Sequence, residues 1–523
     1  MIVIQADLVT FDDTHRVLRG GRILVGDDKR IAAVLESGEA LPAAFAGARV
    51  VTYDGYAYPG LIDCHNHIAY NTIGLWTIPS RLEPFVDHNE WTRPVVYNRQ
   101  ITAPQKLLGQ AAGPSLLAYV ETKAMLGGTT TIQGSGRFPA VADVLTRNLD
   151  SERFSGDADR YRVDTLVKHD AAGFAGVRQD MIDGQGYIYH LAEGVDRPAM
   201  AAEWQLALDG DVIRERLVAI HGTGLSKNEL GRLAEVGATL VWSPFSNLWL
   251  YGATADIITA RAKGLRLCLG SDWAPSGTRN VLGELKVASL WNQDPAAWYP
   301  PGAAVPPVPP LVFEDRDLCD LVTRNPGDAV ALVYGPQIGR IQAGYLADLI
   351  LVRAKHDDAY RNLIAAVEVD VELVLVGGEA RCGTAQLIAA SGTKRTTVVS
   401  VAVGGMVHKR KVLIRNPQDV TKTMTWRSVV KRLEDVRKHP ELAELAFAED
   451  VATGADDDLF IVEGDMPFGD PGEDEFLAFG LEPPPVEIPA LDPLWHDQAF
   501  FDAVDANPYH RELLSPLRQF FGL

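Results

Sequence analysis

Residues 58–71 read YPGLIDCHNHIAYN, a short apolar run that ends at Asp63 and Cys64 and leads directly into His65 and His67. In an extended strand, residues two apart project to the same side, so the two imidazoles can reach one cation from a rigid base. In a chain with 12 histidines, one such pair also arises by chance. Other polar residues must therefore decide between a metal site and a surface strand.

Three of those residues follow short β-type runs: His190 ends GYIYH, His221 ends RLVAIH, and Asp272 follows LRLCLGS. Between about 58 and 335 such runs alternate with segments of helical period, which predicts a parallel sheet with covering helices. Over ~250 residues a (β/α)8 barrel is the expected closure, with polar side chains at the strand ends converging on its mouth. The histidines and Asp272 are therefore expected to meet at one site.

The chain divides into four predicted parts. Residues 1–57 and 336–415 carry β-rich runs punctuated by glycine, which predict the two halves of one small β-sandwich domain. Residues 58–335 form the predicted barrel, in which 68–127 is too long for a simple connection and is expected to form loops and helices over the mouth. Residues 416–523 form a helical and acidic extension whose role the sequence does not indicate.

Charge is unevenly distributed in this chain, whose formal net charge is −20. Residues 449–523 contain 18 Asp and Glu against two basic residues, a net −16, and aromatic residues recur through them. We expect this tail to pack on its own body or on a second subunit, which allows a homo-oligomer. A basic cluster just upstream is its expected internal partner, and no nucleic-acid partner is expected because the rest of the chain lacks a basic footprint. The cluster comprises Lys409, Arg410, Lys411, Arg415, Lys422, Arg427, Lys431, Arg432, Arg437 and Lys438.

Composition also limits the compartment and the metal chemistry. The first residues, MIVIQADLVTFDD, lack the basic and apolar regions of a signal peptide, and no uncharged apolar run reaches about 18 residues, so a cytoplasmic protein without a membrane partner is expected. The four cysteines lie far apart without a CxxC pair, which argues against a disulfide framework and a thiolate zinc site. Any metal is then expected to bind nitrogen and oxygen ligands.

The motifs, taken in order, resemble the amidohydrolase superfamily, closest to its subgroup of cytosine, guanine and triazine deaminases and chlorohydrolases. PGLIDCHNH resembles the first-strand PGxxDxHxH of that family, and HLAEG resembles its fifth-strand HxxE. LVAIHGTGLSKNEL is similar to the sixth-strand histidine segment, LVWSPFSNLWLYG to the P-x-S-N-x-x-L segment, and LGSDWAPSG to the eighth-strand aspartate segment. The resemblance covers roughly residues 1–385, and the chain from about 386 onward lies outside it.

This resemblance implies a metal centre and three catalytic residues. His65, His67, His190 and Asp272 would bind one divalent ion, zinc or alternatively iron, which activates water. Glu193 would shuttle a proton, His221 would hold or polarise the water or the substrate, and Asp272 would also accept the proton of the water. The implied reaction is hydrolysis of a non-peptide carbon–nitrogen bond in a small cyclic or aromatic substrate.

Several alternatives stay open at this point. The reaction is either deamination or the opening of a cyclic amide or amidine, because the Gly194-Val195-Asp196 that follows Glu193 departs from the hydroxyl and acidic residues common in the deaminases. A binuclear cyclic-amide hydrolase would use Lys168 as a carboxylated bridging ligand. The barrel is also compatible with a metal-free binding or scaffold protein. Each residue also has its own structural alternative: Glu193 as a helix-start carboxylate, His221 as a core histidine and Asn247 as a turn residue.

Overall fold

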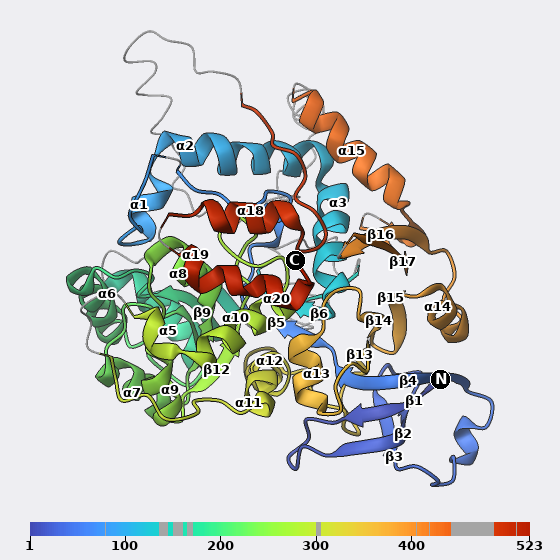
Figure 1. Ribbon diagram of the computed structural model, residues 1–523. Coiled ribbons are helices and arrows are strands. Elements are labelled where there is room, and N and C mark those ends of the chain that lie inside the picture. The colour runs from blue at the N-terminus through green and yellow to red at the C-terminus, as the bar shows by residue number, and fades with distance from the viewer. Residues whose placement is uncertain are drawn as a thin grey trace.

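The computed structural model describes residues 1–78, 80–134, 145–149, 161–164, 171–299, 305–403, 405–417, 419–440, 486–508 and 510–523. A barrel of parallel strands lies beside a mixed β-sheet, and the C-terminal helices lie against the barrel (Figure 1). Among the described residues, none of the helices combines the length and the apolar composition that crossing a bilayer requires.

The barrel strands form two parallel arcs. The first holds β5 (Leu61–Asp63), β6 (Thr129–Ile132) and β7 (Arg147–Asn148), and the second holds β8 (Tyr161–Asp164), β9 (Gly186–Leu191), β10 (Leu217–His221), β11 (Thr239–Trp242) and β12 (Arg266–Leu269). A parallel backbone bridge between Asn66 and Asp272 joins the residues that follow β5 to those that follow β12. The first and last strands of the barrel are thereby brought together at its mouth.

Helices connect these strands, as the alternating sequence pattern predicts. They are α1 (His88–Thr92), α2 (Val95–Tyr97), α3 (Ala103–Leu126), α5 (Ala175–Ile182), α6 (Arg197–Asp209), α7 (Lys227–Glu235), α8 (Pro244–Tyr251), α9 (Ile257–Ala262), α10 (Val281–Gln293), α11 (Asp315–Asp320) and α12 (Arg324–Tyr334). A capping box explains why α7 begins where it does. The Ser226 side chain accepts a hydrogen bond from the Glu229 amide, and the Glu229 carboxylate accepts one from the Ser226 amide. Residues 68–126 form loops and helices, and Asp87 bridges Gly194 beside the mouth.

A nine-stranded mixed sheet unites the two ends of the chain, as predicted. It contains β1 (Ile2–Val9), β2 (Val17–Val25), β3 (Ile31–Leu35), β4 (Arg49–Pro59), β13 (Leu349–Arg353), β14 (Val371–Val376), β15 (Glu379–Gly383), β16 (Thr397–Val403) and β17 (Met406–Val412). Strand β4 pairs in parallel with β1 and antiparallel with β13. Ile4 and Leu8 share one apolar core with Leu351 and Leu373, so both chain ends are needed for this core.

The C-terminal part adds further helices to this frame. Helices α13 (Ala359–Ala365) and α14 (Ala385–Ser391), the short strands β18 (Arg415–Asn416) and β19 (Asp419–Thr423), and α15 (Trp426–Lys438) precede residues 441–485, which lie outside the described residues. After them, residues 486–497 lead into α18 (Gln498–Ala506), α19 (Arg511–Leu514) and α20 (Arg518–Phe521). Phe500, Phe501 and Phe521 are buried in the main core, so this described part of the tail packs on the body of the protein.

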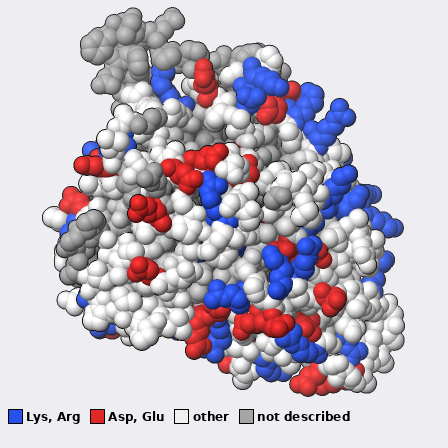
Figure 2. Space-filling view, in the orientation of Figure 1, with Lys and Arg blue, Asp and Glu red and all other residues white. Residues whose placement is uncertain are grey.

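The expected pairing between the basic cluster and the acidic tail stays a prediction, because 12 of the 18 acidic residues of the tail lie between 449 and 485, outside the described residues. Figure 2 shows Lys and Arg side chains gathered along the edge where Figure 1 places α15, β16 and β17. Two of these cations bind neighbours within the described residues: Lys431 pairs with Asp435 on the same helix, and Arg415 donates to Glu379. The buried tail carboxylate Asp492 is bound by other cations of the body, described below.

Candidate metal centre

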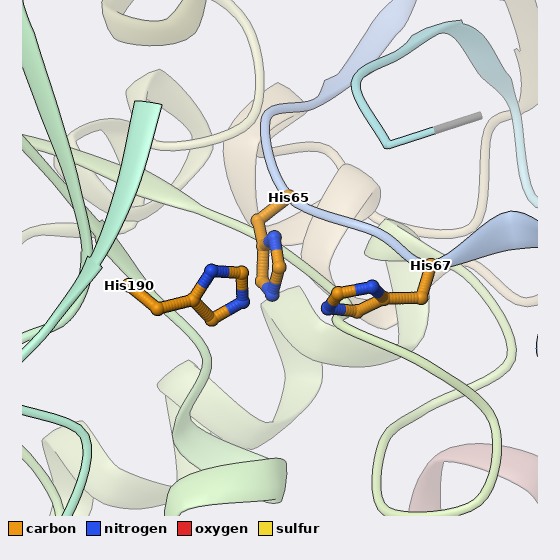
Figure 3. Close-up of side chains that lie close together, drawn as sticks. All are labelled: His65, His67 and His190. Carbon is orange, nitrogen blue, oxygen red and sulfur yellow. The ribbon is translucent and has the colours of Figure 1, made fainter. Parts of the chain in front are cut away.

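Four histidines and one aspartate meet at the mouth of the barrel. His65 and His67 follow β5, His190 lies in β9, His221 ends β10, and Asp272 follows β12. His65 Nε2 lies 3.0 Å from Asp272 Oδ1, and His67 Nε2 lies 3.6 Å from the same oxygen. Figure 3 shows the rings of His65, His67 and His190 turned toward one another, and their ligand atoms all lie within 4.8 Å of each other. The residues that the sequence suggests as ligands are therefore adjacent in space.

A buried carboxylate holds the two strand ends that carry these ligands. Asp63 accepts hydrogen bonds from the Ser271 amide at 3.1 Å and the Ser271 hydroxyl at 2.5 Å, and from the Asn66 amide group at 3.0 Å. Burial raises the pKa of Asp63 to about 6. Gly134 closes against the same loop, because a Cβ there would lie 1.4 Å from the Asn66 carbonyl oxygen and its φ is +97°. The loop 65–67 is thus fixed from two sides.

Backbone strain is concentrated at the same strand ends. His221 and Asp272 have φ values of 67° and 59°, and Ala192, beside His190, has a φ of 53°. A left-handed conformation costs a non-glycine residue on the order of 1 to 3 kcal/mol and persists where the surroundings enforce it. Such outliers cluster at functional sites, and here they direct side chains into the barrel mouth.

The protonation states of these residues suit a metal ion. Burial, reinforced by the neighbouring imidazoles of His65 and His221, lowers the pKa of His190 far below its usual range. Burial also lowers the pKa of His221 to about 3, although the charge of Asp272 acts in the opposite direction. For Asp272, burial alone would raise the pKa, but the charge and hydrogen bond of His65 keep the pKa below its ordinary value. At neutral pH His190 and His221 are therefore neutral imidazoles and Asp272 is an ionised carboxylate, the forms that bind metals.

One nitrogen of the candidate ligands has no hydrogen-bond partner in the part of the chain that the structure describes. The Nδ1 atom of His190 is buried and makes no hydrogen bond to the described residues. A buried polar atom without a partner costs about 1 to 3 kcal/mol, which a bound ion or water would recover. Nitrogen and carboxylate donors in this number suit zinc or ferrous iron. The residues that are present thus fit a divalent ion.

Glu193 and His221 form a second pair beside the histidines. Their closest atoms, Glu193 Oε1 and His221 Nε2, lie 3.7 Å apart, and both side chains are buried. The Tyr251 hydroxyl donates a 2.5 Å hydrogen bond to the same Glu193 oxygen. The Asn247 amide donates to His221 Nδ1 at 3.0 Å, so the proton of the neutral ring is on Nε2, which faces Glu193. The carboxylate and the imidazole are both oriented before any ligand arrives.

Both orienting residues come from helix α8. The structure places Asn247 inside this helix, so its interpretation as a turn residue is wrong. Tyr251 matches none of the motifs that predicted the other site residues. The spacing of the sequence does link Tyr251 to the site, because Asn247 and Tyr251 are four residues apart and so lie on one face of a helix.

Aromatic side chains border the site next to His67. The Trp273 ring lies 6.2 Å from the His67 ring and 5.4 Å from the Trp91 ring, measured between centroids. The Trp91 indole nitrogen donates to the Tyr251 hydroxyl at 2.8 Å, which links this aromatic wall to Glu193. Lys168, the candidate bridging ligand of the binuclear alternative, lies outside the described residues.

Comparisons with known proteins agree with this geometry, although no protein-family model matches the chain. The chain is 31% identical over 152 residues to a 5-methylthioadenosine/S-adenosylhomocysteine deaminase of Pyrococcus furiosus, which covers 29% of this chain and 33% of that protein. A deaminase of the same name from Nitratidesulfovibrio vulgaris is 25% identical over 423 residues, 72% of this chain and 90% of that protein. Against the first three relatives the match spans only 33% to 45% of their length.

Solved structures share the fold. An adenosine deaminase from Xanthomonas campestris with bound zinc matches 75% of this chain and 97% of its own at 20% identity, with a TM-score of 0.54. An atrazine chlorohydrolase from Arthrobacter aurescens, complexed with zinc, matches 75% and 99% at 18% identity, with a TM-score of 0.53. The fold and the site thus define a barrel protein with a histidine-rich mouth. The order of the motifs resembles that of the amidohydrolase superfamily, and the relatives that match the chain are deaminases.

Proposed function

We propose that the protein is a hydrolase with one catalytic metal ion that cleaves a non-peptide carbon–nitrogen bond, by deamination of a small aromatic or cyclic substrate. The observation that carries this proposal is the meeting of His65, His67, His190 and Asp272 at the ends of three barrel strands, beside the oriented pair Glu193 and His221. The deaminases among the relatives favour amino-group removal over ring opening.

The metal would be held by His65, His67, His190 and Asp272. A divalent ion bound there, with zinc as our first choice, supplies the Lewis acidity that lowers the pKa of water to about 7. Side chains of the protein supply the groups that move protons and hold the substrate. Asp272 is ionised and within hydrogen-bond distance of His65, so it can take a proton from water while it holds its position.

Glu193 is the proposed proton carrier of the reaction. Its Oε1 accepts the hydrogen bond of Tyr251, which fixes the carboxylate so that it can receive a proton from water and deliver it to a ring nitrogen or a leaving amino group. His221, with its proton on Nε2, can donate a hydrogen bond to the reacting group of the substrate. These roles need both side chains to be held in place, as the bonds from α8 do.

The surroundings of His67 favour an aromatic substrate. His67 is the more exposed of the two paired histidines, with 17% of its side chain accessible against 1% for His65. The buried rings of Trp273 and Tyr70 lie next to it, with centroids 6.2 and 6.4 Å from the His67 ring. Aromatic surfaces of this kind suit a flat heterocycle. The relatives named above are deaminases of adenine-bearing compounds, so an aminopurine nucleoside is the first class to assay.

The test combines a metal measurement with an activity screen. Purified protein should contain one zinc or iron per chain by elemental analysis, and should release ammonia from 5-methylthioadenosine or another aminated heterocycle in a panel that also includes cyclic amides and amidines. Two metals per chain, one of which is lost in Lys168→Met, would favour the binuclear alternative. A metal-free, inactive protein would favour the scaffold alternative and overturn the proposal.

A further inference from the structure

The described end of the chain inserts one carboxylate into the body of the protein. Asp492 is 6% exposed and receives two parallel hydrogen bonds from the Arg279 guanidinium, at 2.8 and 2.7 Å, together with one from Lys123. Its backbone amide donates to the Thr72 carbonyl at 2.8 Å, and its carbonyl accepts from the Tyr119 hydroxyl at 2.7 Å. A segment outside the family-like region thus binds residues inside it through both its side chain and its backbone.

A second contact anchors the same segment four residues later. His496 accepts a hydrogen bond from the Arg279 amide at Nε2, at 3.3 Å, and its Nδ1 lies 2.8 Å from Glu368 Oε1. His496 and Glu368 are both buried. Asp492 and His496 therefore meet Arg279 from two sides, its guanidinium and its backbone.

A chain of hydrogen bonds leads from Asp492 to the loop that carries the metal ligands. Lys123 is fully buried and donates to the Asn71 carbonyl as well as to Asp492. The Asn71 side chain donates to Asn66 Oδ1 at 3.0 Å and accepts from the Ala274 amide at 2.8 Å. Asn66 lies between His65 and His67, and Ala274 lies two residues after Asp272. Asn71 therefore joins the two strand ends that carry three of the four candidate ligands.

We propose that Asp492 is a positioning residue of the metal centre: by holding Lys123 on the Asn71 carbonyl and by binding the Thr72 carbonyl, it fixes the loop that bears His65 and His67. This inference rests on the proposed function insofar as that loop binds a metal. It gives the C-terminal extension a role in the site, although no residue of the extension is a candidate ligand.

The chemistry of the cluster requires a carboxylate at this place. Lys123 and Arg279 belong to the body and are both buried. Without Asp492, Arg279 would keep only its 3.5 Å ion pair with Asp497, and Lys123 would lose the carboxylate that it contacts. Burial lowers the pKa of Lys123 to about 8, while the charge of Asp492 acts to raise it. A Lys123 that is not held by the carboxylate would turn away or lose its proton, and either change weakens its bond to Asn71.

The experiment compares Asp492→Asn with Asp502→Asn, a matched change at a carboxylate of the same extension that is 64% exposed. Zinc affinity is measured on the full-length chain by competition with a chelator. Supports for metal ligands are worth about 10- to 100-fold in affinity, so Asp492→Asn should bind zinc more weakly by that factor, whereas Asp502→Asn should match the wild type. Unchanged zinc affinity in Asp492→Asn would overturn the inference.

A double variant separates positioning from stability. Lys123→Met combined with Asp492→Asn removes the buried charge of Lys123, which has lost its carboxylate, so its melting temperature should rise above that of Asp492→Asn alone. Its zinc affinity should stay low, because the bond from Lys123 to Asn71 is missing. If zinc affinity recovered together with stability, Asp492 would serve folding only, and the inference would be wrong.

Hydrogen exchange keeps the inference testable without a metal. If the wild type itself binds no zinc, the proposed function fails, but the backbone amides of residues 65–74 should still exchange faster in Asp492→Asn than in Asp502→Asn. Equal protection of this loop in the two variants would overturn the inference independently of the proposed function.

Discussion

Two buried polar clusters lie on either side of Asn71, and they are built in opposite ways. Around Asp492 each strong charge faces an opposite charge, with a bidentate guanidinium and a buried lysine on one carboxylate. At the barrel mouth, imidazoles crowd together instead, with the rings of His65 and His190 only 4.7 Å apart. The Nδ1 atom of His190 has no hydrogen-bond partner among the described residues, and His221 and Asp272 have left-handed backbones.

This difference distinguishes a cluster that stabilises the structure from a cluster that binds a ligand. A buried network of paired opposite charges makes a region rigid and gains little from an added ligand, even where single atoms such as Arg279 Nη1 make no hydrogen bond to the described residues. A cluster of like groups with depressed pKa values and strained backbones is costly by itself and gains most from an added cation. This contrast agrees with ligand binding at the mouth and with the positioning role proposed for Asp492.

The largest effect is expected at His67. His67→Ala removes one imidazole from the mouth, so most of the bound metal and essentially all turnover should be lost. Because the side chain is not part of the barrel core, circular dichroism and the elution volume should match the wild type. Elemental analysis of the purified variant provides the measurement, and full metal occupancy would show that His67 is not a ligand.

Glu193 should have the next largest effect, on turnover alone. Glu193→Gln keeps the size of the side chain but removes its basic carboxylate, so turnover should fall by ~10² to 10⁴, the usual contribution of a positioned acid–base group. The metal content should stay at the wild-type level, and KM should change far less than kcat. Steady-state kinetics on any substrate found in the screen would measure this. Glu193 precedes α6, which begins at Arg197, so it is not a helix-start carboxylate; a metal-loaded variant with full turnover would show that the proton travels by another route.

A smaller loss is expected from the support of Glu193. Tyr251→Phe removes the hydroxyl that donates to Glu193 while the ring remains in place, so kcat should fall about 10- to 100-fold, as for other residues that orient a catalytic group. Tyr299→Phe is a suitable control, because its hydroxyl binds Asp256, a different carboxylate. Equal kcat values for the two variants would show that Tyr251 does not orient Glu193 for catalysis.

The smallest effect concerns a third kind of buried carboxylate, one held by neutral donors. Glu284 accepts hydrogen bonds from the Phe245 amide and the Thr278 hydroxyl, and burial raises its pKa from 4.5 to about 8. Between pH 4.5 and about 8 the folded state therefore keeps a proton on Glu284 that the unfolded state releases. The stabilisation from this bound proton is complete below pH 4.5 and is lost as the pH rises toward 8.

Glu284→Gln should remove this dependence. Between pH 5 and 8 the free energy of unfolding of the wild type should fall relative to the variant by at most about 1.4 kcal/mol per pH unit. Denaturant titrations of both proteins across this range provide the test. Parallel stability curves would show that Glu284 titrates normally despite its burial.

The sequence predicted the parts of the molecule that local patterns encode. The spacing of His65 and His67, and the positions of His190, His221 and Asp272 after apolar runs, led to a single site because strand ends of a parallel barrel share one edge. The mixed sheet could also be expected, because β-rich runs occur at both ends of the family-like region. Glu193 could be placed beside His190 from its spacing alone.

The contacts of the tail could not be predicted in this way. Asp492 and Lys123 are 369 positions apart, and no periodicity reports such a partner. The expected pairing of the tail with the basic cluster stays a prediction, because most of the acidic residues of the tail lie outside the described residues. Cations on a helix such as Arg437 are satisfied by acids three or four residues away, here Glu434.

The central claim is that the barrel mouth binds one metal ion through residues from three strand ends. Anomalous diffraction from a zinc-loaded crystal at the zinc absorption edge tests it most directly. The account predicts one strong peak per chain, about 2.0 to 2.2 Å from nitrogens of His65, His67 and His190 and from an oxygen of Asp272. A peak bound elsewhere, a second peak of equal height in the same site, or a mouth without any peak would contradict it.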